Sequence, residues 1–206
     1  MKSFLEALRT QRWDDHRFYH QSRINQSLHF ISAVSFLAAY VMLFVSPAMA
    51  AIVGWLVSMA TRQSGHFFFE PLGFDKVNQV SNEHKESIKV GYNLKRKMVL
   101  IGIWAAAPLA LAVDPTLFGI FQAAADRTQL IEQIGLIWLF VGVGGLLFRT
   151  VHLFFIRDVQ TGLVWMTKIL TDPFHDIKLY YAAPLHLLRG ELIDPMHHAT
   201  QHDSGA

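Results

Sequence analysis

Long apolar runs separated by short polar segments dominate the pattern of hydrophobic and polar positions along this chain. A helix needs about 20 residues, within a range of about 17 to 25, to cross a bilayer. Four runs approach or reach that length, and they cover residues 28–45, 48–69, 98–113 and 133–156. The pattern therefore predicts an all-α, polytopic membrane protein with about four transmembrane helices.

The spacing of the runs predicts two helical hairpins. Only Ser46 and Pro47 separate the first two runs, which is too short for anything but a tight turn between antiparallel helices. The third run is short and contains Pro108, so a tilt, a kink at this proline and a re-entrant extension through residues 115–122 stay open. The fourth run has glycines that allow close approach of a neighbouring helix, namely Gly142, Gly144 and Gly145.

Amphipathic segments flank the four runs, and we assign residues 1–206 to one membrane domain. Residues 28–156 carry the transmembrane helices, and residues 1–27 form an interfacial segment before them. Residues 157–195 interleave aromatic, apolar and basic residues, so we expect an amphipathic segment on the cytoplasmic face that serves as a lid or anchor. Residues 196–206 are expected to form a disordered tail.

Composition agrees with a membrane protein and limits its chemistry. Apolar residues make up 52% of the chain and charged residues only 17%, and the mean hydropathy is +0.27. Cysteine is absent, which excludes disulfides, thiolate nucleophiles and cysteine-based zinc or iron–sulfur sites. No P-loop, Rossmann glycine pattern or serine nucleophile elbow is present, and the basic residues match the membrane topology better than a nucleic-acid face. Any metal must therefore be held by nitrogen and oxygen ligands.

The basic residues predict the orientation in the membrane. Of the 18 lysines and arginines, five precede or begin the first run, seven lie around the loop between the second and third, and five follow or end the fourth. Only Arg127 remains for the opposite side. Because cytoplasmic loops carry an excess of Lys and Arg, both termini are expected to be cytoplasmic.

All eleven histidines lie on the same predicted side as the basic residues. Taken singly, a histidine at a membrane interface is more often an ordinary hydrogen-bonding residue. Bilayer insertion does not require this one-sided distribution, because the loop on the other side would accept histidine equally well. Together the histidines favour a polar site at the cytoplasmic ends of the helices.

The spacing of some histidines and their polar neighbours along the chain predicts a metal site. Asn25 and His29, and likewise His66 and Glu70, are four residues apart and share a helix face. His20 and His29 are nine apart, which places them on opposite faces of a straight helix. We therefore expect a break in residues 22–27, with Asn25 capping or near the start of the membrane helix. The first hairpin then brings His29 near His66.

Imidazole and carboxylate ligands without sulfur suit iron, manganese or zinc, and such sets with open positions often hold Fe(II) that activates O₂. Two short motifs carry these residues, in the order His20-x4-Asn25-x3-His29 and then Gly65-His66-x3-Glu70. They resemble the Mpo1-like family of small membrane proteins, formerly a domain of unknown function. The likeness covers about residues 15–75.

The resemblance implies an Fe(II)-dependent dioxygenase that uses O₂ to shorten 2-hydroxy fatty acids by one carbon in α-oxidation. It carries over to five positions, with the histidines as metal ligands and the other two as catalytic residues: His20, His29, His66, Asn25 and Glu70.

Further polar residues are candidates for the same site. His84, in a charged loop, and His152, near the end of the fourth run, are possible further ligands, with a solvated or structural histidine as the equal alternative. The carboxylate of a fatty acyl substrate is expected to be drawn to basic residues at the cytoplasmic helix ends. Arg62 and Arg96 are the main candidates, beside Lys95 and Lys97.

Other function classes stay open at this stage. A di-iron lipid hydroxylase is disfavoured because the spacing His-x-x-His-His is missing. A non-catalytic, His-rich protein that binds metal or packs through histidine remains an alternative. Transport is weakened because the centres of the first, third and fourth runs carry no ionisable residue. The expected partners are the bilayer and a long-chain 2-hydroxy fatty acid or other lipid, and no nucleic acid; the number of metal ions stays open.

The first prediction concerns topology. A reporter fused after Ala206 and a second inserted near Pro115 should be found on opposite sides of the membrane, because the basic residues divide so unevenly. Accessibility labelling in intact cells and inverted vesicles measures this. If both reporters lie on one side, the orientation and a cytoplasmic metal site are wrong.

Overall fold

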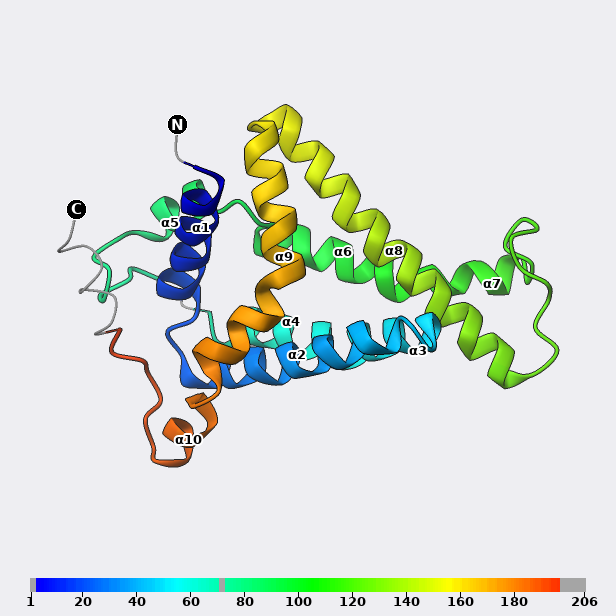
Figure 1. Ribbon diagram of the computed structural model, residues 1–206, viewed down its shortest axis with the longest axis horizontal. Helices are drawn as coiled ribbons and strands as arrows, with labels where there is room; N and C mark the ends of the chain where they lie inside the picture. Colours follow the sequence, from blue (N-terminus) through cyan, green and yellow to red (C-terminus); the bar gives the residue numbers. More distant parts are fainter. Residues whose placement is uncertain (1–2, 71–72, 197–206) are drawn as a thin grey trace.

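The structure is a computed structural model that describes residues 3–70 and 73–196. Every regular element within these residues is a helix, which confirms the all-α class (Figure 1). Histidines 197, 198 and 202 and nearly all of the predicted disordered tail lie outside the described residues. The helices are α1 (Phe4–Tyr19), α2 (Arg23–Met42), α3 (Pro47–Val53), α4 (Ala60–Phe68), α5 (Asn82–Ile88), α6 (Leu94–Ala106), α7 (Ala110–Val113), α8 (Arg127–Ile156), α9 (Val159–Tyr180) and α10 (Ala183–Leu188), with a π-helical turn η1 (Gly54–Met59) and a 3₁₀ turn η2 (Ala107–Leu109).

Three helical stretches are long and apolar enough to cross a membrane, which agrees with a membrane protein. They are Arg23–Met42, Leu94–Val113 and Arg127–Ile156, and they correspond to the first, third and fourth apolar runs. The second run is helical as α3, η1 and α4, but it is not one of these three. Its last turns carry polar residues, including Arg62, Gln63 and His66, which lower its hydropathy.

The break between α1 and α2 lies where the histidine spacing requires a turn. α1 ends at Tyr19, and Ser22 caps α2, its side-chain oxygen accepting a hydrogen bond from the backbone N–H of Asn25 at 3.4 Å. Asn25 is therefore close to the helix start but is not the cap. Its side chain instead donates a hydrogen bond to the carbonyl of Tyr19.

Pro108 decides the form of the third stretch. It sits in η2, a single tightened turn between α6 and α7, as expected where proline removes a backbone donor. The helix ends at Val113, and the carboxylate of Asp114 then accepts hydrogen bonds from the backbone N–H groups of Thr116 and Phe118 at 2.9 and 2.8 Å. The chain turns here, and residues 115–122 form no re-entrant helix.

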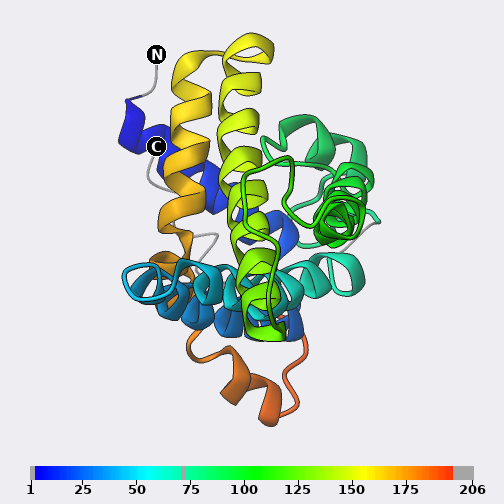
Figure 2. The same cartoon turned by 90° about the vertical axis from the view of Figure 1, so that its right-hand side faces the viewer.

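The molecule is elongated, with α1, α5 and α10 gathered at one end and α7 with the following loop at the other (Figure 1). α2 lies against the stretch from α3 to α4, which runs back along it. α8 packs on α3, and α9 returns beside α8 to contact α2 and α1 (Figure 2). The helices α1, α5 and α10 therefore lie at the end of the molecule where α1 meets the ends of α2, α4 and α9.

The glycines of α8 have two different surroundings. Gly142 faces the indole of Trp55, and a Cβ there would lie 3.6 Å from the ring. Gly144 and Gly145 have nothing within 4 Å of an added Cβ, so they bring no helix closer and instead border a cavity. The closest backbone approach is at Gly135, whose added Cβ would lie 2.5 Å from the carbonyl oxygen of Ala48.

α9 differs from the membrane-surface segment expected for residues 157–195. Its polar residues Lys168, Asp172 and Asp176 are buried, and the helix packs on α1, α2 and α8. Their partners are charged residues from other helices, so the polar stripe of α9 faces the protein interior.

The segment after α10 fastens the junction between α1 and α2. Arg23 donates its backbone N–H to the carbonyl of Leu192 at 2.9 Å, and Asp194 donates its N–H to the carbonyl of Gln21 at 2.8 Å. The buried Asp194 carboxylate pairs with Arg23 at 3.0 Å and accepts a hydrogen bond from Gln26 at 2.8 Å. The segment around residues 192–194 is thereby tied to the turn that carries His20.

Substitution Asp194→Ala should destabilise the protein by about 3 kcal/mol, because it leaves the partly buried guanidinium of Arg23 and the buried amide of Gln26 without their shared carboxylate. Thermal unfolding of the purified protein in detergent measures the loss. Glu191→Ala is the matched control, since Glu191 pairs with His186 on the exposed side of the same segment and such surface pairs contribute little. Equal unfolding temperatures for both variants would contradict this account.

Candidate metal centre

Three histidines from three elements meet at the polar end of the molecule. His20 caps the end of α1, His29 lies in the second turn of α2, and His66 lies in α4. One ring nitrogen from each lies within 4.8 Å of the others. The ring centroids are 4.1 to 5.3 Å apart. Among the described residues, these three form the group that could hold a metal ion.

The state of the rings fits a metal site. His20 and His29 are buried, and neither nitrogen of either ring has a hydrogen-bond partner within the described residues. Leaving a buried polar group unpaired costs about 1–3 kcal/mol, which a bound metal ion would relieve. Two nitrogens bound to one ion at about 2.1 Å lie at most about 4.2 Å apart, so small side-chain rotations suffice to close the group.

Burial lowers the pKa of His20 well below its ordinary value of 6.5, and the neighbouring His29 and Arg62 lower it further. A metal ligand must be the neutral imidazole. His20 therefore needs no deprotonation at neutral pH before it can bind a metal ion.

Glu70 orients the third ring. Its carboxylate oxygens accept one hydrogen bond from Nδ1 of His66 at 2.8 Å and one from the ammonium group of Lys89 at 2.9 Å. Such a partner fixes the tautomer and leaves Nε2 for the metal. The described geometry thus gives Glu70, expected as a catalytic residue, the role of holding His66.

Asn25 and Gln26 position His20 through the backbone. The side-chain amide of Asn25, which is fully buried, donates to the carbonyl of Tyr19 at 2.8 Å. That of Gln26 donates to the carbonyl of His20 at 2.8 Å. These carbonyls are at the end of α1, where the helix itself supplies no donor. Asn25, the other residue expected to be catalytic, is thus used to fix the turn before His29.

Gly65 lets α4 approach α2 at the level of the cluster. A Cβ added there would overlap Oδ1 of Asn25 and lie 3.4 Å from Cδ2 of His29. Since the overlap falls on a fully buried side chain, only glycine fits without displacement of these neighbours.

A buried charge group on α9 backs His29. The Asp176 carboxylate lies 3.6 Å from Nδ1 of His29 and pairs with Arg62 of α4 at 3.0 Å. Arg62 also lies 3.6 Å from Asp172. The guanidinium of Arg62 is thereby engaged by two carboxylates, so this candidate for substrate binding has a structural role in joining α4 to α9.

The same group continues to α1. Lys168 pairs with Asp172 at 2.8 Å and with Asp15, and Arg12 lies 3.3 Å from Asp172. Burial lowers the pKa of Lys168, but the two carboxylates outweigh this and raise it above its ordinary value. Lys168 therefore stays charged and links α1 to α9.

The α9 residues were missed as site residues by the sequence analysis. Tyr180 is buried, and its hydroxyl group lies 3.1 Å from Nδ1 of His16, while its ring centroid lies 5.8 Å from that of His20. The available signal was the repeat of polar residues every four positions through Lys168, Asp172 and Asp176 to Tyr180. That spacing marks one face of a helix, but it does not say which partner the face meets.

His84 and His152 lie outside the three-histidine group. His84 is on α5, with its ring edge-on to Phe18. His152 stacks on Phe148, and its Nδ1 lies 3.1 Å from the guanidinium of Arg149. His175 of α9 also lies outside the group.

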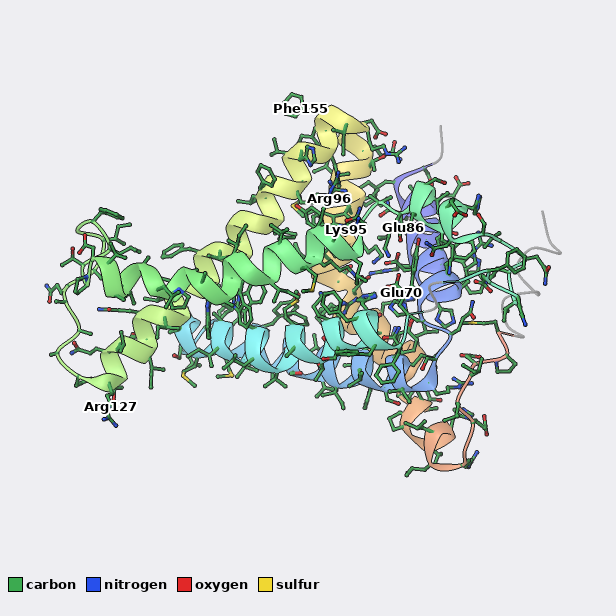
Figure 3. The ribbon with its side chains drawn as sticks, turned by 180° about the vertical axis from the view of Figure 1, so that it is seen from behind. Glu70, Glu86, Lys95, Arg96, Arg127 and Phe155 are labelled. Carbon is green, nitrogen blue, oxygen red and sulfur yellow. The ribbon has the colours of Figure 1, made fainter. Side chains whose placement is uncertain are left out.

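A cavity of about 990 Å³ begins at the cluster. His20 and His66 form part of its wall, and much of the remainder is apolar, with Phe36, Trp55 and Trp138 among the lining residues. Lys97 also lines it, whereas Arg96 does not and has an exposed side chain. Figure 3 shows Glu70 at the same end of the molecule as Lys95 and Arg96, with Arg127 at the opposite end.

Comparison of this chain with protein-family models, with curated proteins and with solved structures gives no match.

Substitution Gly65→Ala should weaken metal binding about tenfold or more, because the methyl group displaces Asn25 and presses on His29; changes behind metal ligands commonly cost 10–100-fold. Titration of purified, metal-depleted protein with Co²⁺ or Zn²⁺ measures the affinity. The control is Gly102→Ala, where an added Cβ has nothing within 4 Å. Unchanged affinity in the Gly65 variant would mean that these histidines do not form the metal site.

Proposed function

We propose that this chain is an Fe(II)-dependent membrane dioxygenase that shortens 2-hydroxy fatty acids by one carbon, as in the Mpo1-like family that its motifs resemble. The observation that carries the proposal is the group of His20, His29 and His66, of which His20 and His66 line a large apolar cavity. A candidate metal site thus lies beside a cavity with room for a hydrocarbon chain.

The proposed topology has four spans in two hairpins, with both termini and the histidine group on the cytoplasmic side. Three of the spans are the long apolar helical stretches. The fourth is the stretch from α3 to α4, which lies along α2. The division of basic residues supports the orientation.

His20, His29 and His66 would hold the metal, and three nitrogen ligands leave open positions as in oxygen-activating Fe(II) sites. Such a set also suits zinc or manganese, and the motif resemblance is what favours iron. When bound, Fe(II) supplies the activation of O₂ for cleavage of the bond between C1 and C2. The overall reaction balances when the 2-hydroxy acid and O₂ give the shortened acid, CO₂ and water.

The protein itself contributes ligand orientation and an apolar space. Glu70 holds His66 and Asp176 lies behind His29, so that the two rings are fixed before substrate enters. The cavity wall takes up the acyl chain, and burial of each methylene contributes about 0.8 kcal/mol. Because the cavity lies between helices, the chain can remain in apolar surroundings while its carboxyl end reaches the histidines.

The test is anaerobic reconstitution of the purified protein with Fe(II), followed by O₂ and a long-chain 2-hydroxy acid. We expect about one iron per chain, uptake of O₂ and a product one carbon shorter by mass spectrometry. His20→Ala and His66→Ala should lose bound iron and turnover together. His186→Ala is the control, since His186 is paired with Glu191 near the surface.

Two results would overturn the proposal in different ways. Stoichiometric iron without consumption of O₂ or acid would leave a His-rich metal protein without this chemistry. Equal iron content in all variants and the wild type would remove the metal site itself.

A further inference from the structure

Four cationic side chains line the cavity, and three of them already have carboxylate partners. The paired cations are Arg62, Lys89 and Lys168. Lys97 is the exception: in the part of the chain that the structure describes, its ammonium group has no hydrogen-bond or ion-pair partner. The carboxylates of Glu70 and Asp15 act on Lys97 only from beyond ion-pair distance. Among the described residues, Lys97 is therefore the cavity cation without a directly paired carboxylate.

Lys97 lies in the first turn of α6, at the polar end of the cavity. It is partly buried and lines the same cavity as His66. An ammonium group withdrawn from water without a partner is costly. An anionic group that enters the cavity would remove this cost and form a charge-assisted hydrogen bond.

The rest of the cavity suits a long hydrocarbon chain. Along the stretch from α3 to α4 its wall extends from His66 back to Ala50, which corresponds to about 24 Å of helix. Gly144 and Gly145 widen it, because no side chain projects there. A molecule with one anionic end and a long apolar tail matches both the charge and the length.

We propose that Lys97 binds the carboxylate of a single-chain fatty acid whose tail lies in this cavity. The assignment rests on the proposed function only in that the bound acid would be the molecule oxidised at the histidine group. Lys97 then selects acids over neutral lipids of the same length and places the carboxyl end beside His66. Arg62, which is engaged by two aspartates, and Arg96, which is exposed, take no part.

Binding is tested on the metal-free protein, so that it does not depend on turnover. The purified chain in detergent is titrated with a long-chain fatty acid brominated along its tail, which quenches nearby tryptophans such as Trp55 and Trp138. The brominated primary alcohol of the same length is titrated in parallel. Lys97→Met removes the charge and keeps a long side chain, and Lys97→Arg restores the charge.

We expect Lys97→Met to weaken binding of the acid about tenfold, the effect of one charge-assisted hydrogen bond, and to leave binding of the alcohol unchanged. Lys97→Arg should bind the acid nearly as the wild type does. Lys95→Met is the matched control, because Lys95 is an exposed lysine two residues away that does not line the cavity. It should not change either affinity.

The inference is overturned if Lys97→Met and Lys95→Met bind the acid equally well, or if the acid and the alcohol lose affinity together. Its failure is separable from that of the dioxygenase. Charge-dependent binding without O₂ consumption would keep the Lys97 site and remove the proposed reaction. Turnover with the same KM in wild type and Lys97→Met would keep the reaction and remove the Lys97 site.

Discussion

The buried pairing of Arg62 with Asp176 and Asp172 is the interaction on which the rest of this structure depends. It joins α4 to α9 across a distance of more than one hundred residues in sequence. Loss of one partner would leave a charge buried without compensation, which is far more costly than the loss of a surface pair. The pairing fastens α9 to α4 and keeps the Asp176 carboxylate behind His29.

The three-histidine group and the cavity follow from the same arrangement. α9 covers His20 and His29 with Tyr180 on one side, while the glycines of α8 leave a space open on another. Tyr180 therefore screens His20 and His29 from water on one side, and His20 and His66 border the apolar cavity on the other. This combination distinguishes the group from histidines at the surface, such as His186, whose ring is partly exposed and paired with a nearby carboxylate.

Much of the fold could be predicted from the sequence because its signals are local. The length and hydropathy of the apolar runs predicted the three long helical stretches, and the nine-residue spacing of His20 and His29 predicted a turn between them. The cap at Ser22 was missed because Asn25 is an equally good capping residue, and only the backbone angles distinguish the two. The buried partners of α9 were not predicted, because an amphipathic helix has the same pattern whether its polar face meets lipid headgroups or buried charges.

The sequence by itself determined which residues could share a helix face. On that ground it predicted two pairs of neighbouring site residues, Asn25 with His29 and His66 with Glu70. Only the tertiary structure decided how these side chains are used. Asn25 fixes a backbone carbonyl, Glu70 holds His66, and Arg62 is engaged by aspartates. Of the cations that line the cavity, Lys97 is left without a hydrogen-bond or ion-pair partner among the described residues. The reason is physical: helix periodicity is fixed by neighbouring residues, whereas the partner of a buried charge is set by segments far away in the chain.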